Sequence, residues 1–273
     1  MERNTAKRTL EKLLSVCICL CMLGAMLPAQ VFAEEADTAQ TETVQDTAPK
    51  DTVHLSSADY LIQLAKNCRL DSWSQNRTVV LEADVDLSSV DFNGIPSFGG
   101  TWEGQNHAIT GLSLSQDGSV QGLFRYVQQG ALVRDMTVQG RIKPGGTRAS
   151  VGGIAGSNAG TIENCAFDGV VSGTSQIGGI AGVNTVKGSI NGCTVSGTVY
   201  GSPFVGGVVG QNDGVAANCT NVASVNTTVS QNEVKLNDLT LDNVLKTEKA
   251  NDVTDAGGIA GNNAGVLRAC LNR

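Results

Sequence analysis

Glycine-rich segments are the first residues in this chain whose spacing suggests chemistry, because glycine-rich turns can cradle a phosphate group. One such segment reads VGGIAGSNAGTIENC over residues 151–165. Its pattern returns as IGGIAGVNTVKGSINGC at 177–193, VGGVVGQNDGVAANC at 205–219 and AGGIAGNNAGVLRAC at 256–270. A nucleotide site needs its loop once, whereas a stacked coil needs its corner in every turn. The recurrence therefore predicts a repeat architecture and disfavours a phosphate site.

Each repeat ends in a cysteine, and thiolates bind soft metals or pair as disulfides. The residues are Cys165, Cys193, Cys219 and Cys270. Met136 and Leu112 are expected at the same position in earlier coils, and no histidine accompanies the thiols. A position that accepts Leu, Met or Cys requires an apolar filler of small to medium size. Buried free thiols are therefore favoured, with a disulfide second and a metal site last.

Glycine and asparagine recur with the cysteines and complete a predicted structural ladder. The ladder residues are Gly153, Gly179, Gly207, Gly258, Asn158, Asn184, Asn212 and Asn263. We expect the glycines at corners, which need backbone freedom including positive φ, and where neighbouring walls lie close together. Asparagine tolerates left-handed backbone geometry, and stacked asparagine side chains can bond one another along the axis.

An acidic cluster is the remaining candidate site. Asp84 and Asp86 lie two residues apart on a predicted strand, so they face the same way, and Asp91 follows. These carboxylates form a weak Ca²⁺ candidate, although a solvated face is favoured. With Glu103 they are also the candidates for acid–base work on a glycan, for which the nearest basic set on one wall would be Arg125, Arg134, Arg141, Lys143 and Arg148.

The other signatures of catalysis are missing from the sequence. It has no nucleophile elbow, no HExxH and no paired CxxC. His54 is expected in solvent, and His107 is expected to have a structural role at a corner. The sequence therefore predicts no catalytic residue, no metal and no cofactor.

The elements that position these residues are short strands. Apolar residues and glycines recur every 24 to 29 residues, which predicts an all-β, right-handed parallel β-helix solenoid. Before it, Leu61, Leu64 and Cys68 lie on one face of a short N-terminal cap helix, which Ser56 or Ser57 can cap. Residues 77–88 are expected to form one strand.

The chain divides into four segments. Residues 1–33 have the basic start, apolar run and Val-Phe-Ala end of a Sec-type signal peptide, and 34–52 form a disordered acidic linker. The cap helix and first strands occupy 53–100, and the β-helix repeats occupy 101–273. An insertion of about 223–255 is expected, with a short helix in 235–246, and the array is expected to be truncated within a coil at its C-terminus. A lipoprotein or an uncleaved anchor is the alternative to cleavage.

The charge of the chain excludes some partners. Cleavage after residue 33 removes four basic and two acidic residues, which takes the net charge from −7 to −9. This charge argues against nucleic acid and against an anionic membrane surface. Membrane contact is therefore expected only through the signal peptide before cleavage, and the protein is expected to be secreted or at the bacterial cell surface.

The three glycine-rich repeats between residues 151 and 219 resemble the GLUG-type repeats of exported bacterial surface proteins. FGGTWEGQNHAITGLSL, QGLFRYV and SADYLIQLAKNCRL resemble the first coils of such proteins, so the resemblance covers about 53–273. It implies a non-catalytic module, a rigid stalk or an adhesive region that binds host or cell-wall glycan or protein.

Two other readings stay open beside this module. One is a carbohydrate-active enzyme, a polysaccharide lyase or hydrolase, with a cleft on the β-helix wall. The other is a fragment without independent function, for which open strand edges predict end-to-end self-association.

Overall fold

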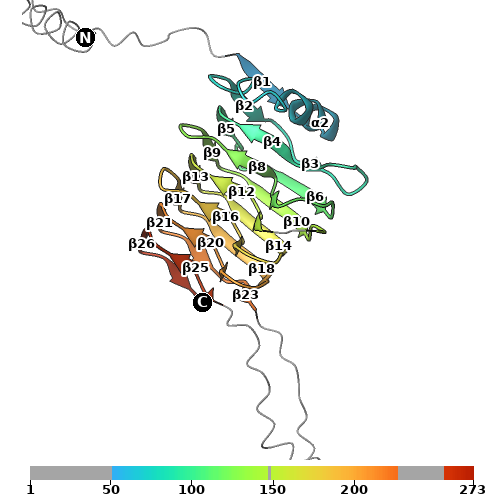
Figure 1. Ribbon diagram of the computed structural model, residues 1–273. Coiled ribbons are helices and arrows are strands. Elements are labelled where there is room, and N and C mark those ends of the chain that lie inside the picture. Colours follow the sequence, from blue (N-terminus) through green and yellow to red (C-terminus); the bar gives the residue numbers. More distant parts are fainter. Residues whose placement is uncertain (1–50, 147–148, 227–254) are drawn as a thin grey trace, which may run out of the picture. The chain divides into compact units, whose positions relative to one another are not determined.

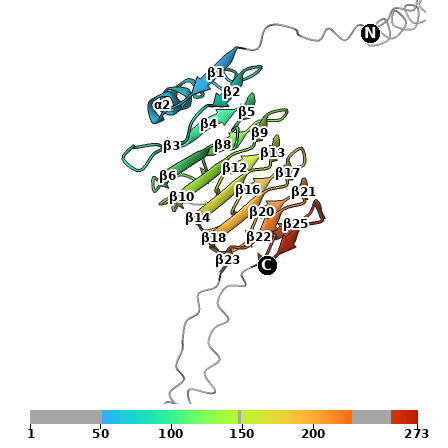
Figure 2. The same ribbon diagram turned by 180° about the vertical axis from the view of Figure 1, so that it is seen from behind.

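The protein is a parallel β-solenoid of about six turns with one helix, as seen in a computed structural model (Figures 1 and 2). The structure describes residues 51–146, 149–226 and 255–273. The predicted class, an all-β parallel solenoid, is confirmed. Every strand pair among the described residues is parallel, and each strand pairs with its equivalent in the coils before and after it.

Four parallel sheets form the walls. Sheet A contains β1 (Thr52–Leu55), β2 (Thr78–Leu81), β5 (Thr101–Glu103), β9 (Leu132–Arg134), β13 (Thr161–Glu163), β17 (Ser189–Asn191), β21 (Val215–Ala217) and β26 (Val266–Arg268). Sheet B contains β3 (Val85–Asp86), β6 (Ala108–Leu114), β10 (Thr137–Ile142), β14 (Ala166–Ser172), β18 (Thr194–Tyr200), β22 (Thr220–Asn221) and β27 (Leu271–Asn272), with β23 (Ser224–Val225) beside β18. Sheet C contains β4 (Ile95–Phe98), β8 (Phe124–Val127), β12 (Ala155–Asn158), β16 (Ala181–Asn184), β20 (Val209–Asn212) and β25 (Ala260–Asn263). Sheet D contains β7 (Val120–Gln121), β11 (Ser150–Gly152), β15 (Ile177–Gly178), β19 (Val205–Gly206) and β24 (Ala256–Gly257).

The core lies inside the four walls. Along the axis Ile162 pairs with Ile190, and Phe167 pairs with Val195, with all four side chains buried. Since strands stack about 4.8 Å apart, each inward column is a continuous row of packed apolar side chains. The apolar residues that recur once per coil in the sequence are therefore the residues that fill the core.

The N-terminal region differs in part from the prediction. Helix α2 (Ala58–Asn67) buries Leu61 and Leu64, as its spacing indicates, but Ser57 stands at the N-cap without a side-chain hydrogen bond. The segment 77–88 does not form one strand. It turns a corner after Leu81, so that β2 joins sheet A and β3 joins sheet B. Strand β1, which pairs with β2 at the edge of sheet A, was not predicted.

The ladder glycines serve close packing and not positive φ. A Cβ on Gly153 would lie 2.2 Å from the carbonyl oxygen of Gly179, and one on Gly179 would lie 2.5 Å from that of Gly207. Positive φ occurs instead at the corner between sheets A and B. There the residues are Asp135, Asn164, Gly192, Asn218 and Ala269. The ladder glycines do lie at a corner, in the bend between sheet D and sheet C, as expected. The expectation of positive φ there was wrong, because the close approach of the next coil is what requires glycine at these positions.

The expected insertion starts and ends in different sheets. β23 pairs with β18 in sheet B, and the next described strand, β24, pairs with β19 in sheet D. The connection between these two strands includes residues 227–254, which lie outside the described residues. The short helix expected within 235–246, the signal peptide and most of the acidic linker also lie outside them.

Candidate functional site

A ladder of buried asparagines runs along sheet C. The Nδ2 group of Asn158 donates to Oδ1 of Asn184 at 2.8 Å, Asn184 donates to Asn212 at 2.8 Å, and Asn212 donates to Asn263 at 2.7 Å. The first three side chains are fully buried, and Asn263 is exposed in the last coil. None of the four has positive φ. The ladder therefore uses the side-chain amide of asparagine and not its tolerance of left-handed backbone.

Each ladder asparagine also closes a turn in its own coil. Asn158 accepts a hydrogen bond from the Gly160 amide at 3.1 Å and donates to the Gly160 carbonyl at 3.2 Å. Asn212 repeats the contact to the carbonyl of Gly214 at 3.4 Å. A buried amide that is fully paired stabilises the fold and fixes its register, because a shifted coil would leave donors and acceptors unpaired.

A second asparagine pair was missed by the sequence reasoning. Asn221 is buried in sheet B and donates to Oδ1 of Asn272 at 2.7 Å. It occupies the column in which Phe167 and Val195 lie in earlier coils. Its signal in the sequence is a polar residue two positions after Cys219 and again two positions after Cys270, where earlier repeats have an apolar residue.

The four repeat cysteines form an inward column between sheets A and B. All are free thiols, and Cys270 alone among the four is partly exposed. Each donates to the carbonyl two residues before it, for example Cys165 to Glu163 at 3.3 Å and Cys219 to Ala217 at 3.2 Å. Met136, which is buried, lies in this column. Leu112 does not, because it pairs with Gly140 in β10, so the expected equivalence of Leu112 with the cysteines was wrong.

Burial and the neighbouring groups determine the pKa values of the thiols in the cysteine column. Burial raises the pKa of the Cys165 thiol to about 12. The neighbouring Cys219 side chain, together with burial, raises the pKa of Cys193 well above its ordinary value. Cys68 is separate, at the end of α2, and burial raises its pKa to about 11.

We expect the thiols of the folded protein to react with iodoacetamide in an order set by burial. Cys270 should be alkylated first. Cys165 and Cys193 should be the slowest, because both are buried with raised pKa values. For Cys165, a pKa of about 12 in place of 9.0 alone reduces the thiolate about 1,000-fold. Peptide mapping by mass spectrometry after a short pulse at pH 8 measures the order, and a sample in guanidinium chloride is the control. Equal labelling of Cys165 and Cys270 in the folded chain would contradict the buried column.

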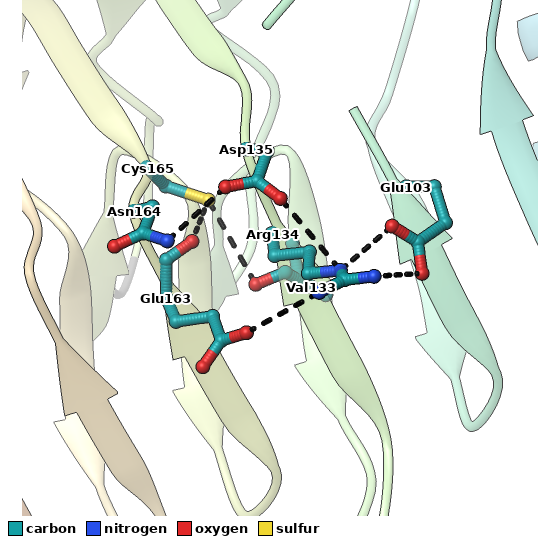
Figure 3. Close-up of polar contacts among 7 residues, drawn as sticks. All are labelled: Glu103, Val133, Arg134, Asp135, Glu163, Asn164 and Cys165. Carbon is teal, nitrogen blue, oxygen red and sulfur yellow. Dashed lines mark hydrogen bonds and ion pairs between the residues drawn. The ribbon is translucent and has the colours of Figure 1, made fainter. Parts of the chain in front are cut away.

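A network of half-buried charged side chains surrounds Arg134 on sheet A (Figure 3). Its guanidinium makes a two-pronged contact with Glu103, with Nε to Oε2 at 2.6 Å and Nη2 to Oε1 at 2.9 Å. Asp135 lies 3.7 Å away and Glu163 lies 3.9 Å away. These contacts arise because Glu103, Arg134 and Glu163 occupy one register position in three successive coils.

This network is suited to holding neighbouring coils together. The bond to Glu103, followed by the charges of Glu103, Asp135 and Glu163, raises the pKa of Arg134. The Glu103 carboxylate and the Arg134 guanidinium are hydrogen-bonded to each other through both carboxylate oxygens, so neither is placed for proton transfer. The sequence analysis did not predict the network. Its signal in the sequence is an acid, a base and an acid, Glu103, Arg134 and Glu163, each about one coil from the next.

The aspartates proposed as a weak Ca²⁺ site have separate partners. Asp84 accepts from the Ala108 amide at 2.8 Å and contacts His107, and these bonds lower its pKa. Asp86 accepts from the Ser88 amide at 2.9 Å, which lowers its pKa. Asp91 accepts from Gln116 at 3.3 Å. Across the described ranges, no group of three or more His, Cys, Asp or Glu side chains could hold a metal ion.

The basic residues considered for an enzyme do not line one wall. Arg125 is on β8 of sheet C, Arg134 is on β9 of sheet A, and Arg141 is on β10 of sheet B. Lys143 follows β10, and Arg148 lies outside the described residues. The expectation of one basic wall was wrong, because residues only 7 to 9 positions apart fall on different sheets of a coil.

The two histidines bond acids in adjacent coils. Nδ1 of His54, which is exposed as expected, lies 2.6 Å from Oε1 of Glu82. Nδ1 of His107 lies 3.0 Å from Oδ1 of Asp84 at the corner before β6. Both contacts join one coil to the next, which is a structural arrangement.

Comparison with known proteins places these coils among repeat modules. The GLUG motif matches residues 147–172, which include the first glycine-rich repeat and all of β14. Halomucin from Haloquadratum walsbyi is 29% identical over 128 residues, which cover 41% of this chain and 1% of that protein. No solved structure matches. The motif, the similarity and the parallel solenoid fit a GLUG repeat family, as the repeats predicted.

The described part of the chain has no helix that is both long enough and apolar enough to span a membrane. End-to-end association requires a second copy and stays a prediction.

Proposed function

We propose that this chain, a parallel solenoid with GLUG-type repeats, is a rigid, non-catalytic module of an exported bacterial surface protein. The observation that supports it is the unbroken asparagine ladder from Asn158 to Asn263, which ties four coils together through buried bonds. Such a ladder holds the coil register and resists bending. A module of this kind spaces or displays other parts of a surface protein and presents its walls to a glycan or protein ligand.

The polar groups support a structural role. The Arg134 network and the two histidine–acid pairs each connect neighbouring coils. In the described residues, the strongly shifted pKa values belong to buried cysteines, whose column is closed to a substrate except at its last member. A hydrolase or lyase would instead need an acid and a base that face a common cleft.

Rigidity is tested by measuring one distance in the full chain. Spin labels are attached through non-canonical residues at Glu82 and Arg268, which lie near opposite ends of sheet A, so that the native thiols stay unlabelled. Six strand spacings predict a narrow distance distribution centred at about 30 Å. The same pair in guanidinium chloride is the control. A broad distribution in buffer would contradict a rigid module.

Absence of turnover is tested separately with the full chain. A panel of acidic and neutral polysaccharides should show no change in chain length or ultraviolet absorbance after long incubation with the protein. Depolymerisation that disappears in Glu103→Gln or Asp84→Asn would establish the enzyme and overturn the proposal.

A further inference from the structure

Helix α2 lies beside the first coils, at the N-terminal end of the stack (Figures 1 and 2). A groove lies where this helix meets the coils. It has a volume of about 230 Å³ and lies between α2, the segment before β4 and strand β8. Gly94, with φ +78°, forms part of its wall, and a Cβ there would meet the Gly122 carbonyl oxygen at 2.7 Å. The site is therefore a depression bounded by three separate segments.

Three cations line this groove. Lys66 comes from the last turn of α2, Arg69 from the segment after it, and Arg125 from β8. Asp91 is the single acid among the lining residues. The ion pairs of the described residues involve His54, Arg77, His107 and Arg134, so none of the three cations has a carboxylate within 4.0 Å. In a chain of net charge −7, these side chains form a local excess of positive charge.

Helix chemistry accounts for only part of this set. A lysine or arginine near a helix C-terminus stabilises the helix dipole, which explains Lys66 and Arg69. Arg125 lies on a strand of the next coil and takes no part in that effect. Its Nε is 3.4 Å from Oε1 of Gln121, a long contact to a neutral amide, which leaves the guanidinium available.

Part of the groove lining is apolar. It consists of Ile62 and Ala65 of α2, Phe92, which is buried, and Pro96 of β4. A lining that combines apolar and cationic side chains suits a ligand with a hydrophobic face and an anionic substituent. The volume is below the range of about 300–1,000 Å³ that is typical of drug-sized sites, and so is of the size of one sugar unit.

We propose that this groove binds one uronic-acid unit of an acidic polysaccharide. The guanidinium of Arg125 and the cations of Lys66 and Arg69 bind the carboxylate. The apolar part of the groove lining packs against a face of the sugar ring. Arginine is suited to this role because its planar fork pairs with a carboxylate through two hydrogen bonds. The proposal goes beyond the rigid module and does not depend on it.

The test is binding of polygalacturonate oligosaccharides to the full chain by calorimetry at low salt. Methyl-esterified oligosaccharides of the same length are the matched ligand, since esterification removes the carboxylate charge and adds only one methyl group per sugar. We expect at least tenfold weaker binding of the ester. Arg125→Gln should weaken binding of the acid at least tenfold. Arg141→Gln makes the same charge change at an exposed residue of β10, and it should weaken binding less than twofold.

Three outcomes would overturn the proposal. No binding of the acid would do so directly. Equal losses in the two arginine variants would show attraction by net charge alone. Inorganic phosphate that displaces the oligosaccharide at equal concentration would show a general anion site without sugar recognition. Thermal melting of each variant confirms that it is folded, and the distance measurement on the solenoid is independent of all three results.

Discussion

Replacing Asn184 by aspartate should lower the free energy of unfolding at pH 7 by about 3–5 kcal/mol, although the two side chains have the same shape. Asn184 is fully buried, and its Nδ2 donates to Asn212 Oδ1 and to the carbonyls of Gly188 and Val215. An aspartate at this position would place a charged oxygen against three acceptors. Urea unfolding followed by circular dichroism measures the change.

The loss of stability in Asn184→Asp should depend on pH, because the new carboxyl titrates. Burial, with only acceptors around the oxygen that replaces Nδ2, raises the pKa of the carboxyl in the folded state above its unfolded value. The penalty should therefore be largest above the folded-state pKa, and it should shrink as the pH falls through that pKa toward the unfolded value. Asn263→Asp is the matched control, because Asn263 is exposed and can still accept from Asn212 as a carboxylate. Equal losses in the two variants would show that the ladder does not depend on buried amides.

Gly197→Ala should destabilise the protein by at least about 3 kcal/mol or prevent folding, although it adds a single methyl group. Gly197 has φ +95°, and a Cβ there would lie 2.0 Å from the Gly169 carbonyl oxygen. Gly169, with φ +148°, makes the same approach to Gly140, at 1.9 Å. The methyl group would push one coil of sheet B away from the next.

Gly130→Ala separates the cost of the close approach between coils from the cost of the positive φ. Gly130 also has positive φ, at +82°, but a Cβ there has nothing within 4 Å. Its expected cost is about 1–2 kcal/mol, from backbone geometry alone. Soluble yield and urea midpoints of the two variants measure the difference, and a cost at Gly197 no larger than at Gly130 would refute the close approach of the coils.

The sequence by itself determined the repeat architecture. Apolar residues, asparagine and cysteine recur once per coil, and a stacked fold must place chemically equal residues above one another. The asparagine and cysteine columns and the helix face of Leu61 and Leu64 follow from this rule. Local spacing was enough because each repeat contacts its immediate neighbours.

Only the tertiary structure decided where the chain turns between sheets. Strands of two to seven residues leave too little pattern to show a corner, so the segment 77–88 looked like one strand. Because the corners were not known, Leu112 was predicted in the cysteine column, and Arg125, Arg134 and Arg141 were predicted on one wall. One extra residue at a corner reverses which side chains of the next strand face the core. The Arg134 network and the groove at α2 depend on such placements, so the fold had to be known before either could be recognised.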